Sequence, residues 1–234
     1  MSAIDPQSIK IITTEDGSHS LYLPHLNETY HSFHGAWRES IHVYIKCGLA
    51  AYHEQHPEQK EIVVFEVGFG TGLNALLALE YADTHQVKVH FHSIEAFLLE
   101  EKFYKELNYT AMDPSFEKYS ANFLTMHEAP WEADAEISPY FTLHKTKGDL
   151  LTYPFESDVY DVVFYDAFAP RKQPELWSVE ILEKVATAMK SGGIFTTYSA
   201  QGQLKRNLEA AHLQVSKVQG PPGKKEMLTA VKTI

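Results

Sequence analysis

The sequence predicts an α/β protein with a doubly wound, mostly parallel sheet. Apolar runs of strand length alternate with helical patterns through most of the chain, and this alternation is typical of parallel strands joined by helices. One apolar run, residues 62–65, leads into a glycine-rich turn and then a helical pattern. Two more segments expected to be strands, 213–218 and 227–231, follow the last helical segment. We therefore expect one doubly wound sheet that closes on a strand pair.

The composition fits one large domain with a small appendage. The chain has 234 residues, of which 44% are hydrophobic and 22% charged, so it can bury a full core. Residues 9–23 alternate around Asp16-Gly17, a dipeptide that favours a hairpin turn. We expect an N-terminal β-ribbon extension over residues 1–30 and a single domain over residues 31–234.

The cellular location follows from what the sequence lacks. No apolar run is long enough to span a bilayer, and residues 1–6 lack the basic start and apolar core of a signal peptide. The single cysteine, Cys47, cannot form an internal disulfide. We expect a cytoplasmic protein that does not enter membranes. His90 and His92 alternate on one strand without a third ligand nearby, so no metal site is expected.

The glycine-rich turn is the first candidate for a ligand site. Gly68, Gly70 and Gly72 occupy alternate positions directly after the strand, and a helix with regularly spaced leucines begins at Leu73. Glycines there allow a sharp turn and a close approach of the backbone to a ligand. A turn without a ligand is the alternative, but three glycines within five residues favour a cradle for a nucleoside cofactor.

Acidic residues at three strand ends narrow the choice of ligand. Glu95 lies 23 residues beyond Gly72, where an acid is expected to bind ribose hydroxyls. Glu66, just before the first glycine, would repel a pyrophosphate and attract the amino group of a methionyl moiety. The pattern thus favours S-adenosylmethionine over a dinucleotide. Asp149 follows the strand 141–144 and is expected to bind the adenine amino group; capping of the next turn is the alternative.

The segment before the first strand contains further polar candidates. Tyr30, Ser32, Glu39 and Ser40 precede or begin a helix expected over 41–49, and they are candidates for the methionine end of the cofactor. Capping and surface roles are the alternative. Residues 100–140 are expected to be mainly helical, with aromatic residues that build core.

A second block ends the strand 160–165. Asp166-Ala167-Phe168-Ala169-Pro170 follows it directly, and ligands of open α/β sheets lie outside the carboxyl ends of strands. Asp166 could therefore orient an amine and Phe168 could stack on a base. The alternatives are a cap for the helix region 175–190 and a core aromatic. Ser191-Gly192-Gly193 is expected to stop that helix before a strand over 194–198.

Charge is distributed unevenly along the chain. The formal net charge is −11, but residues 1–170 hold 10 Lys/Arg and 26 Asp/Glu, whereas residues 171–234 hold 10 and 5. A basic C-terminal quarter on an acidic body is compatible with a local nucleic-acid footprint. A solvated charged face is the alternative.

Taken together, these blocks resemble a known family. Glu66 to Asn74, Asp166 to Pro170 with Lys172, Pro174 and Trp177, and Gly223 to Leu228 are similar to the methyltransferase half of the bifunctional bacterial enzyme of tRNA methylaminomethyl-2-thiouridine synthesis. The resemblance covers nearly the whole chain in order and includes Gly35 to Ser40. The 234 residues leave no room for the flavin-dependent oxidase half of that enzyme, so we expect a stand-alone methyltransferase.

The resemblance implies a fold, an activity and a partner. It implies a Rossmann-like class I methyltransferase that uses S-adenosylmethionine to N-methylate wobble aminomethyl-(2-thio)uridine in the tRNA anticodon loop. A separate enzyme would then supply the aminomethyl-uridine. It places Thr71 and Asn74 with the cofactor residues and Asp166 and Phe168 at the reaction centre. The expected phosphate contacts are basic residues of the C-terminal quarter: Arg171, Lys172, Lys205, Arg206, Lys224 and Lys225.

Two other functions stay open at this point. A small-molecule amine methyltransferase or polyamine synthase would use the same cofactor fold, and the acidic body suits a polyamine; the Lys224-Lys225 loop does not. A non-catalytic nucleoside- or RNA-binding protein is the other possibility, which intact Glu66, Glu95 and Asp166 disfavour.

Overall fold

The computed structural model describes residues 9–233 and contains two sheets. The smaller sheet is antiparallel, in the order β1-β2-β3, and comprises β1 (Lys10–Thr13), β2 (His19–Leu23) and β3 (Glu28–Thr29). The expected hairpin around Asp16-Gly17 is confirmed, and β3 adds a strand that the sequence pattern did not indicate. Residues 1–8 of the expected extension lie outside the described residues.

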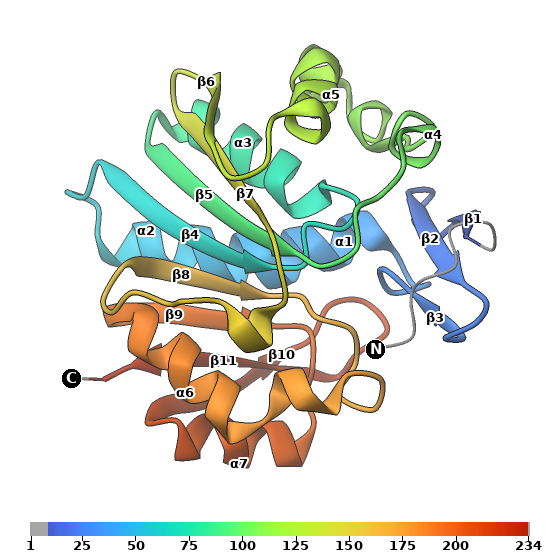
Figure 1. The fold of residues 1–234 in the computed structure, drawn as a ribbon. Helices are drawn as coiled ribbons and strands as arrows, with labels where there is room; N and C mark the ends of the chain where they lie inside the picture. The colour runs from blue at the N-terminus through green and yellow to red at the C-terminus, as the bar shows by residue number, and fades with distance from the viewer. Residues whose placement is uncertain (1–8, 234) are drawn as a thin grey trace.

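The larger sheet is the framework of the molecule (Figure 1). Its order is β10-β11-β9-β8-β4-β5-β7-β6, and the five strands from β9 to β7 run parallel. The edge strands β6 and β10 pair antiparallel with their neighbours, as does β11 between β10 and β9. The strands are β4 (Glu61–Val67), β5 (Lys88–Glu95), β6 (Asp134–Ser138), β7 (Phe141–Lys147), β8 (Tyr160–Tyr165), β9 (Met189–Thr197), β10 (Leu213–Gln219) and β11 (Glu226–Lys232). The doubly wound, mostly parallel sheet is therefore confirmed.

Helices cover both faces of this sheet. Alternate residues of β4 point to opposite sides: Val64 packs in one core with η2 and α3, and Phe65 in another with α6 and α7. The near-continuous apolar strands follow from burial on both faces. The helices are α1 (Ala36–Ser40), η2 (Ile41–Ala50), α2 (Ala51–Gln55), α3 (Leu73–His85), α4 (Glu101–Tyr104), α5 (Ser120–Glu128), α6 (Val179–Ala188) and α7 (Gly202–Ala210). Short 3-10 turns are η3 (Tyr109–Ala111), η4 (Pro114–Tyr119), η5 (Leu150–Thr152) and η6 (Pro174–Trp177).

Three local expectations need correction. The helix expected over 41–49 is longer, because α1, η2 and α2 adjoin, and its middle part has π geometry. A strand, β6, occupies part of the region expected to be helical. The segment Ser191–Gly193 does not stop a helix; α6 ends at Ala188 and β9 begins at Met189. The glycines instead accommodate an irregular register beside β8, where a Cβ at Gly193 would lie 2.8 Å from the Lys190 carbonyl oxygen.

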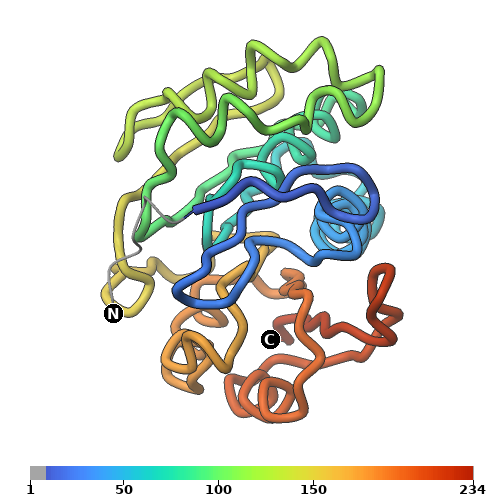
Figure 2. Tube along the Cα trace, turned by 90° about the vertical axis from the view of Figure 1, so that its right-hand side faces the viewer, coloured from blue at the N-terminus to red at the C-terminus, as the bar shows by residue number. Residues whose placement is uncertain are grey.

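The strand order brings together the turns that follow β4 and β8, at the carboxyl ends of the parallel strands. The chain passes from β4 to β5 on one side and later returns to β8 on the other, so β4 and β8 lie at the point where the strand order reverses. The small sheet lies beyond the carboxyl ends of the parallel strands, and Figure 2 shows the N-terminal segment crossing in front of them. Over residues 9–233, no helix is long and apolar enough to cross a membrane.

Candidate functional site

A cavity of about 270 Å³ lies at the carboxyl ends of the central strands. It is enclosed by the turns after β4, β5, β7 and β8 and by the segment from Glu28 to Glu39, which comes from the small sheet and α1. Tyr198 and Lys224 complete its wall. The cavity therefore joins residues from seven parts of the chain at the place where open α/β sheets bind ligands.

The glycine turn forms part of the lining of this cavity. Gly68 has a φ of +91°, and a Cβ there would lie 3.2 Å from the carbonyl oxygen of Asp166. Gly70 has a φ of +51°, and a Cβ there would lie 3.1 Å from the Tyr30 ring. Both conformations are unfavourable for other residues, so the glycines are explained by backbone approach to β8 and to the small sheet. Gly68, Gly70 and Thr71 line the cavity, whereas Gly72 begins α3 behind it.

Glu66 lies beneath the cavity, not in its lining. Its side chain is 0% exposed, and Oε2 accepts a hydrogen bond of 2.6 Å from the Ser93 hydroxyl. Oε1 has no hydrogen-bond partner among the described residues. Burial raises the pKa of Glu66 well above its usual value, and the nearby Asp166 and Glu95 raise it further. Burying an acid without a cation destabilises the folded state. Glu66 is therefore better explained as a ligand-binding group than as a group that stabilises the fold.

Glu95 lines the cavity at the end of β5. Its two oxygens accept backbone hydrogen bonds from Gly70 at 2.9 Å and Phe97 at 2.7 Å. Burial raises the pKa of Glu95, and these N–H groups oppose that effect. The carboxylate thus ties the glycine turn to β5 and keeps lone pairs for a ligand, as expected of an acid that binds a ribose diol.

Asp166 contacts the two helices beside the glycine turn, through Tyr44 of η2 and Asn74 of α3. Its Oδ1 accepts from the Tyr44 hydroxyl at 2.6 Å, and its Oδ2 accepts from Asn74 Nδ2 at 2.8 Å. Burial raises the pKa of Asp166 to about 7, although both hydrogen bonds oppose the shift. Asn74, expected among the cofactor residues, lines the cavity but is engaged with Asp166. The pair Tyr44 and Asn74 fixes the direction of this carboxyl group.

Phe168 forms an aromatic wall with Tyr30. Their ring centroids are 5.4 Å apart in an edge-to-face arrangement, and both residues line the cavity. The backbone of Phe168 is held on both sides, because its N–H donates to Gln173 Oε1 at 3.2 Å and its carbonyl accepts from Trp177 Nε1 at 2.8 Å. The wall is therefore a fixed surface against which a planar ring fits.

The remaining sequence candidates divide into two groups. Asp149 both lines the cavity and caps η5, since its Oδ1 accepts from the Leu151 N–H at 3.0 Å. Tyr30, Ser32 and Glu39 also line the cavity. Ser40 does not: it is 0% exposed and lies outside the lining, so the expectation that it contacts the ligand is not supported by its position.

The six basic candidates occupy different positions. Lys224 lines the cavity itself, and Arg171 lines its rim while donating to Glu28 at 2.7 Å. Lys172 donates to the Leu26 carbonyl. Lys205 pairs with Glu209 at 3.4 Å across one helical turn, and Arg206 donates to Gln203. Lys225 is exposed on the β10–β11 loop.

Sequence reasoning missed several residues of the site. Tyr44 and Tyr198 both have hydroxyl groups at the Asp166 end, where the Tyr198 hydroxyl donates to the Ala167 carbonyl at 2.9 Å. Glu28 and Gln173 also line the cavity. A tyrosine hydroxyl within an apolar helix was the only local signal for Tyr44. Among the described residues, no group of three or more His, Cys, Asp or Glu side chains could hold a metal ion.

Comparison with known families and proteins gives concordant matches. Residues 112–233 match the model of a family described as S-adenosyl-L-methionine-dependent methyltransferase. The chain is 31% identical over 214 residues to the tRNA 5-methylaminomethyl-2-thiouridine biosynthesis bifunctional protein MnmC of Methylobacillus flagellatus, covering 88% of this chain and 33% of that protein. The same-named protein of Nitrosospira multiformis is 29% identical, with 89% and 34% covered. The chain thus spans about a third of the length of these relatives.

Solved structures agree with this placement. The structure of MNMC2 from Aquifex aeolicus superimposes with a TM-score of 0.76 at 26% identity, covering 97% of this chain and 71% of that one. A spermidine synthase from Thermotoga maritima superimposes with a TM-score of 0.55 at 14% identity, covering 97% and 69%. The second likeness concerns the fold alone.

Proposed function

The chain belongs to the S-adenosyl-L-methionine-dependent methyltransferase family whose model it matches, and from that premise we propose that it methylates the aminomethyl group of wobble aminomethyl-(2-thio)uridine in tRNA. The position of Asp166 carries the proposal. This carboxyl group lines the same cavity as the glycine turn, with a pKa raised by burial to about 7 and with Tyr44 and Asn74 fixing its direction. The names of the MnmC relatives support the choice of substrate.

The residues beneath and around the glycine turn fit S-adenosylmethionine. Glu95 keeps acceptor capacity for a ribose diol, and Asp149 lies beside it for the adenine amino group. Glu66 has an unpartnered Oε1 beneath the turn, and a ligand with an ammonium and a sulfonium group would favour the ionised form of this buried carboxyl group. Gly68, Gly70 and Thr71 form the surface in contact with the cofactor, and Gly72 shapes the turn from behind.

The acceptor amine meets this cofactor on the Asp166 side. When bound, S-adenosylmethionine supplies a methyl group on a positively charged sulfur. An aminomethyl group is mostly protonated at neutral pH and attacks only after losing a proton. Asp166 accepts a hydrogen bond from this amine and orients it, and the proton passes to water or to the carboxylate. Holding both partners in attack geometry lowers the barrier by about 7–11 kcal/mol in favourable cases.

Phe168 supports the nucleobase that carries the amine. A wobble base lies in a single-stranded loop, where bases unstack and stack again on aromatic side chains. The wall of Phe168 and Tyr30 offers such a surface next to Asp166. In this proposal, Arg171, Lys172, Lys205, Arg206 and Lys225 contact phosphates around the cavity, and a separate enzyme supplies the aminomethyl-uridine.

The test is transfer of label to RNA. The full chain is incubated with S-adenosylmethionine labelled in the methyl group and bulk tRNA from cells that lack this protein, and the nucleosides are then separated. We expect label in a methylaminomethyl-uridine, and none with the Asp166→Asn variant. The matched control is Asp161→Asn, because Asp161 lies at the opposite end of the same strand. Tight cofactor binding without label in tRNA would overturn the proposal.

One observation favours a second candidate, a small polyamine acceptor. The cavity lining contains the carboxylates of Glu28, Glu39, Glu95, Asp149 and Asp166, which suit a polycation. A parallel incubation with putrescine and spermidine distinguishes the two functions, since label in these amines and not in tRNA would establish the second.

A further inference from the structure

One ion pair in the cavity wall has no part in the proposal above. Lys224 Nζ lies 2.7 Å from Glu39 Oε1, and both residues line the cavity. The Glu39 side chain is 8% exposed and that of Lys224 is 32% exposed. Glu39 comes from α1, and Lys224 from the loop between β10 and β11. The cavity thus presents a hydrogen-bond acceptor and a donor side by side.

Both members of the pair are held in place by the surrounding chain. Glu39 Oε2 accepts from the Ser32 N–H at 2.8 Å. Lys224 Nζ lies 4.3 Å from the centroid of the Tyr198 ring, and the Tyr198 hydroxyl donates to the carbonyl of Ala167, next to Asp166. The pair is therefore fixed relative to the proposed amine site.

Hydrogen-bonding capacity remains on each side of the pair. An ammonium group carries three protons, and one of those on Lys224 is used by Glu39 while the Tyr198 ring faces the group. A carboxylate offers about four lone-pair positions, and Glu39 uses one for Lys224 and one for Ser32. One more donor and one more acceptor are available in the cavity.

We infer that Glu39 and Lys224 recognise the imide edge of the acceptor nucleobase. This inference rests on the proposed function. In a 5-aminomethyl-uracil ring, a carbonyl group follows the substituted carbon, and the ring N–H follows the carbonyl. With the amine at Asp166, Lys224 donates to that carbonyl oxygen and Glu39 accepts from the ring N–H. A cytosine ring reverses this donor and acceptor order, so the pair selects uracil.

This assignment changes the role expected for Lys224. As a phosphate contact it would keep its charge free toward solvent, yet it is paired with a largely buried carboxylate. A second pair in the same part of the chain provides a contrast. Lys217 and Glu226 are 2.8 Å apart, with 47% and 42% of their side chains exposed, and they lie outside the cavity lining. This second lysine-glutamate pair therefore has no access to an acceptor in the cavity.

The test uses three anticodon stem-loop RNAs that differ at the wobble position. They carry 5-aminomethyl-uridine, its N3-methyl derivative or 5-aminomethyl-cytidine, and kcat/KM for methyl transfer is measured for each. The full-length wild-type chain is expected to favour the uridine by about tenfold to hundredfold over the other two, the scale of one bidentate base contact. Glu39→Gln and Lys224→Met are expected to shrink the advantage over cytidine about tenfold.

Matched variants and the wild-type series make the outcome decisive. Glu226→Gln and Lys217→Met make the same chemical changes outside the cavity and are expected to keep the full preference. An unchanged preference in Glu39→Gln and Lys224→Met overturns the inference, as does a wild-type enzyme that methylates all three RNAs equally. If either variant does not fold, as judged by its S-adenosylmethionine affinity, the wild-type series still decides. Absence of transfer to all three RNAs overturns the proposed function itself.

Discussion

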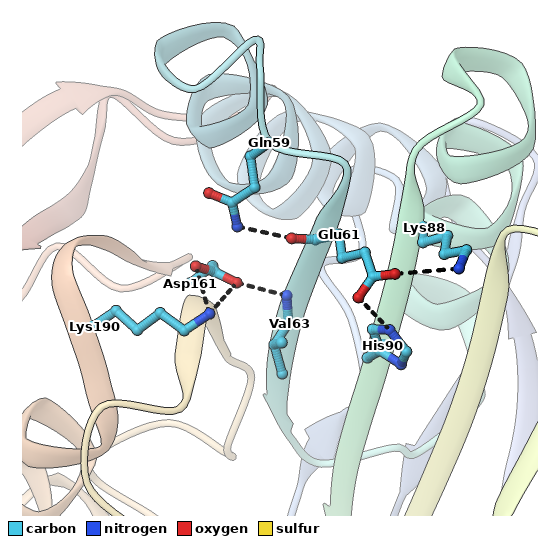
Figure 3. Close-up of polar contacts among 7 residues, drawn as sticks. All are labelled: Gln59, Glu61, Val63, Lys88, His90, Asp161 and Lys190. Carbon is cyan, nitrogen blue, oxygen red and sulfur yellow. Dashed lines mark hydrogen bonds and ion pairs between the residues drawn. The ribbon is translucent and has the colours of Figure 1, made fainter.

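The two ends of the central sheet both hold carboxylates, but in different surroundings. At the amino ends, Asp161 is 1% exposed and accepts from Lys190 at 2.9 Å, from the Val63 N–H at 2.8 Å and from the Tyr52 hydroxyl at 2.8 Å. Figure 3 shows the contacts of Asp161 with Lys190 and Val63. It also shows Glu61, which pairs with Lys88 and His90. Each acid there has a cation.

At the carboxyl ends, the acids that lie on the parallel strands or directly after them lack such cations. Glu66, Glu95 and Asp166 accept hydrogen bonds from hydroxyl, amide and backbone groups, but over residues 9–233 none of the three forms an ion pair. Burial raises the pKa of each. An acid that serves stability is normally paired when buried. Under the proposed function, the amino-end acids hold the fold together and the carboxyl-end acids bind a cationic ligand.

The largest effect is expected for a substitution of Asp166, directly after β8. Asp166→Asn is expected to lower single-turnover methyl transfer about 10²–10⁴-fold, the usual contribution of one group that handles a proton. Its affinity for S-adenosylmethionine should stay within about threefold, because the amine side and not the cofactor side is changed. Asp161→Asn, the control on the same strand, should retain transfer per folded molecule. Equal loss of affinity and transfer in Asp166→Asn would contradict the role given to it.

A smaller effect is expected on the cofactor side. Glu95→Gln removes a carboxylate that accepts from Gly70 and Phe97 and faces the cavity. Hydrogen bonds to charged groups contribute about 1.5–3 kcal/mol, so calorimetry should give an affinity for S-adenosylmethionine that is about tenfold to hundredfold weaker. Glu61→Gln makes the same change at the exposed amino end of β4. Equal weakening in both variants would remove the distinction between the two ends.

The smallest effect concerns two basic residues of the C-terminal quarter, on α7. Lys205→Glu combined with Arg206→Glu should weaken tRNA binding and lower the slope of log affinity against log salt by about one for each phosphate that the variant no longer binds. Lys10→Glu with Lys60→Glu gives the same change of charge away from the C-terminal quarter. If the slopes of both double variants equal that of the wild type, the basic quarter is a solvated face.

The sequence predicted what depends on local pattern. The strands, the glycine turn and the positions of Glu95 and Asp166 at strand ends follow from residues that are near one another in the chain. The hydrogen bond from Tyr44 to Asp166 joins residues 122 apart, and the bond from Lys224 to Glu39 joins residues 185 apart. No local pattern encodes these contacts, because they form only when α1, η2 and the β10–β11 loop pack around the sheet. The roles of the site residues toward cofactor and RNA stay predictions.

The most direct test of the contrast between the two ends is the free energy of unfolding of Asp161→Asn and Asp166→Asn, measured from pH 4 to pH 8. Asp161→Asn should unfold about 1–2 kcal/mol more easily at pH 8, since Lys190 loses its partner. Asp166→Asn should be more stable than the wild type there, by up to about 4 kcal/mol, because each pKa unit corresponds to about 1.4 kcal/mol. The folded carboxyl group holds its proton up to about pH 7, whereas the unfolded one ionises near pH 4.

The contribution of Asp166 to wild-type stability therefore falls as the pH rises from 4 to 7, and the advantage of Asp166→Asn appears over the same range. We predict that, at pH 8, the free energy of unfolding is lower than that of the wild type in Asp161→Asn and higher in Asp166→Asn. Only the difference for Asp166→Asn should grow as the pH rises from 4 to 7. If Asp166→Asn destabilised the chain as much as Asp161→Asn at pH 8, the acids at both ends of the sheet would serve stability, and the contrast between the two ends would be contradicted.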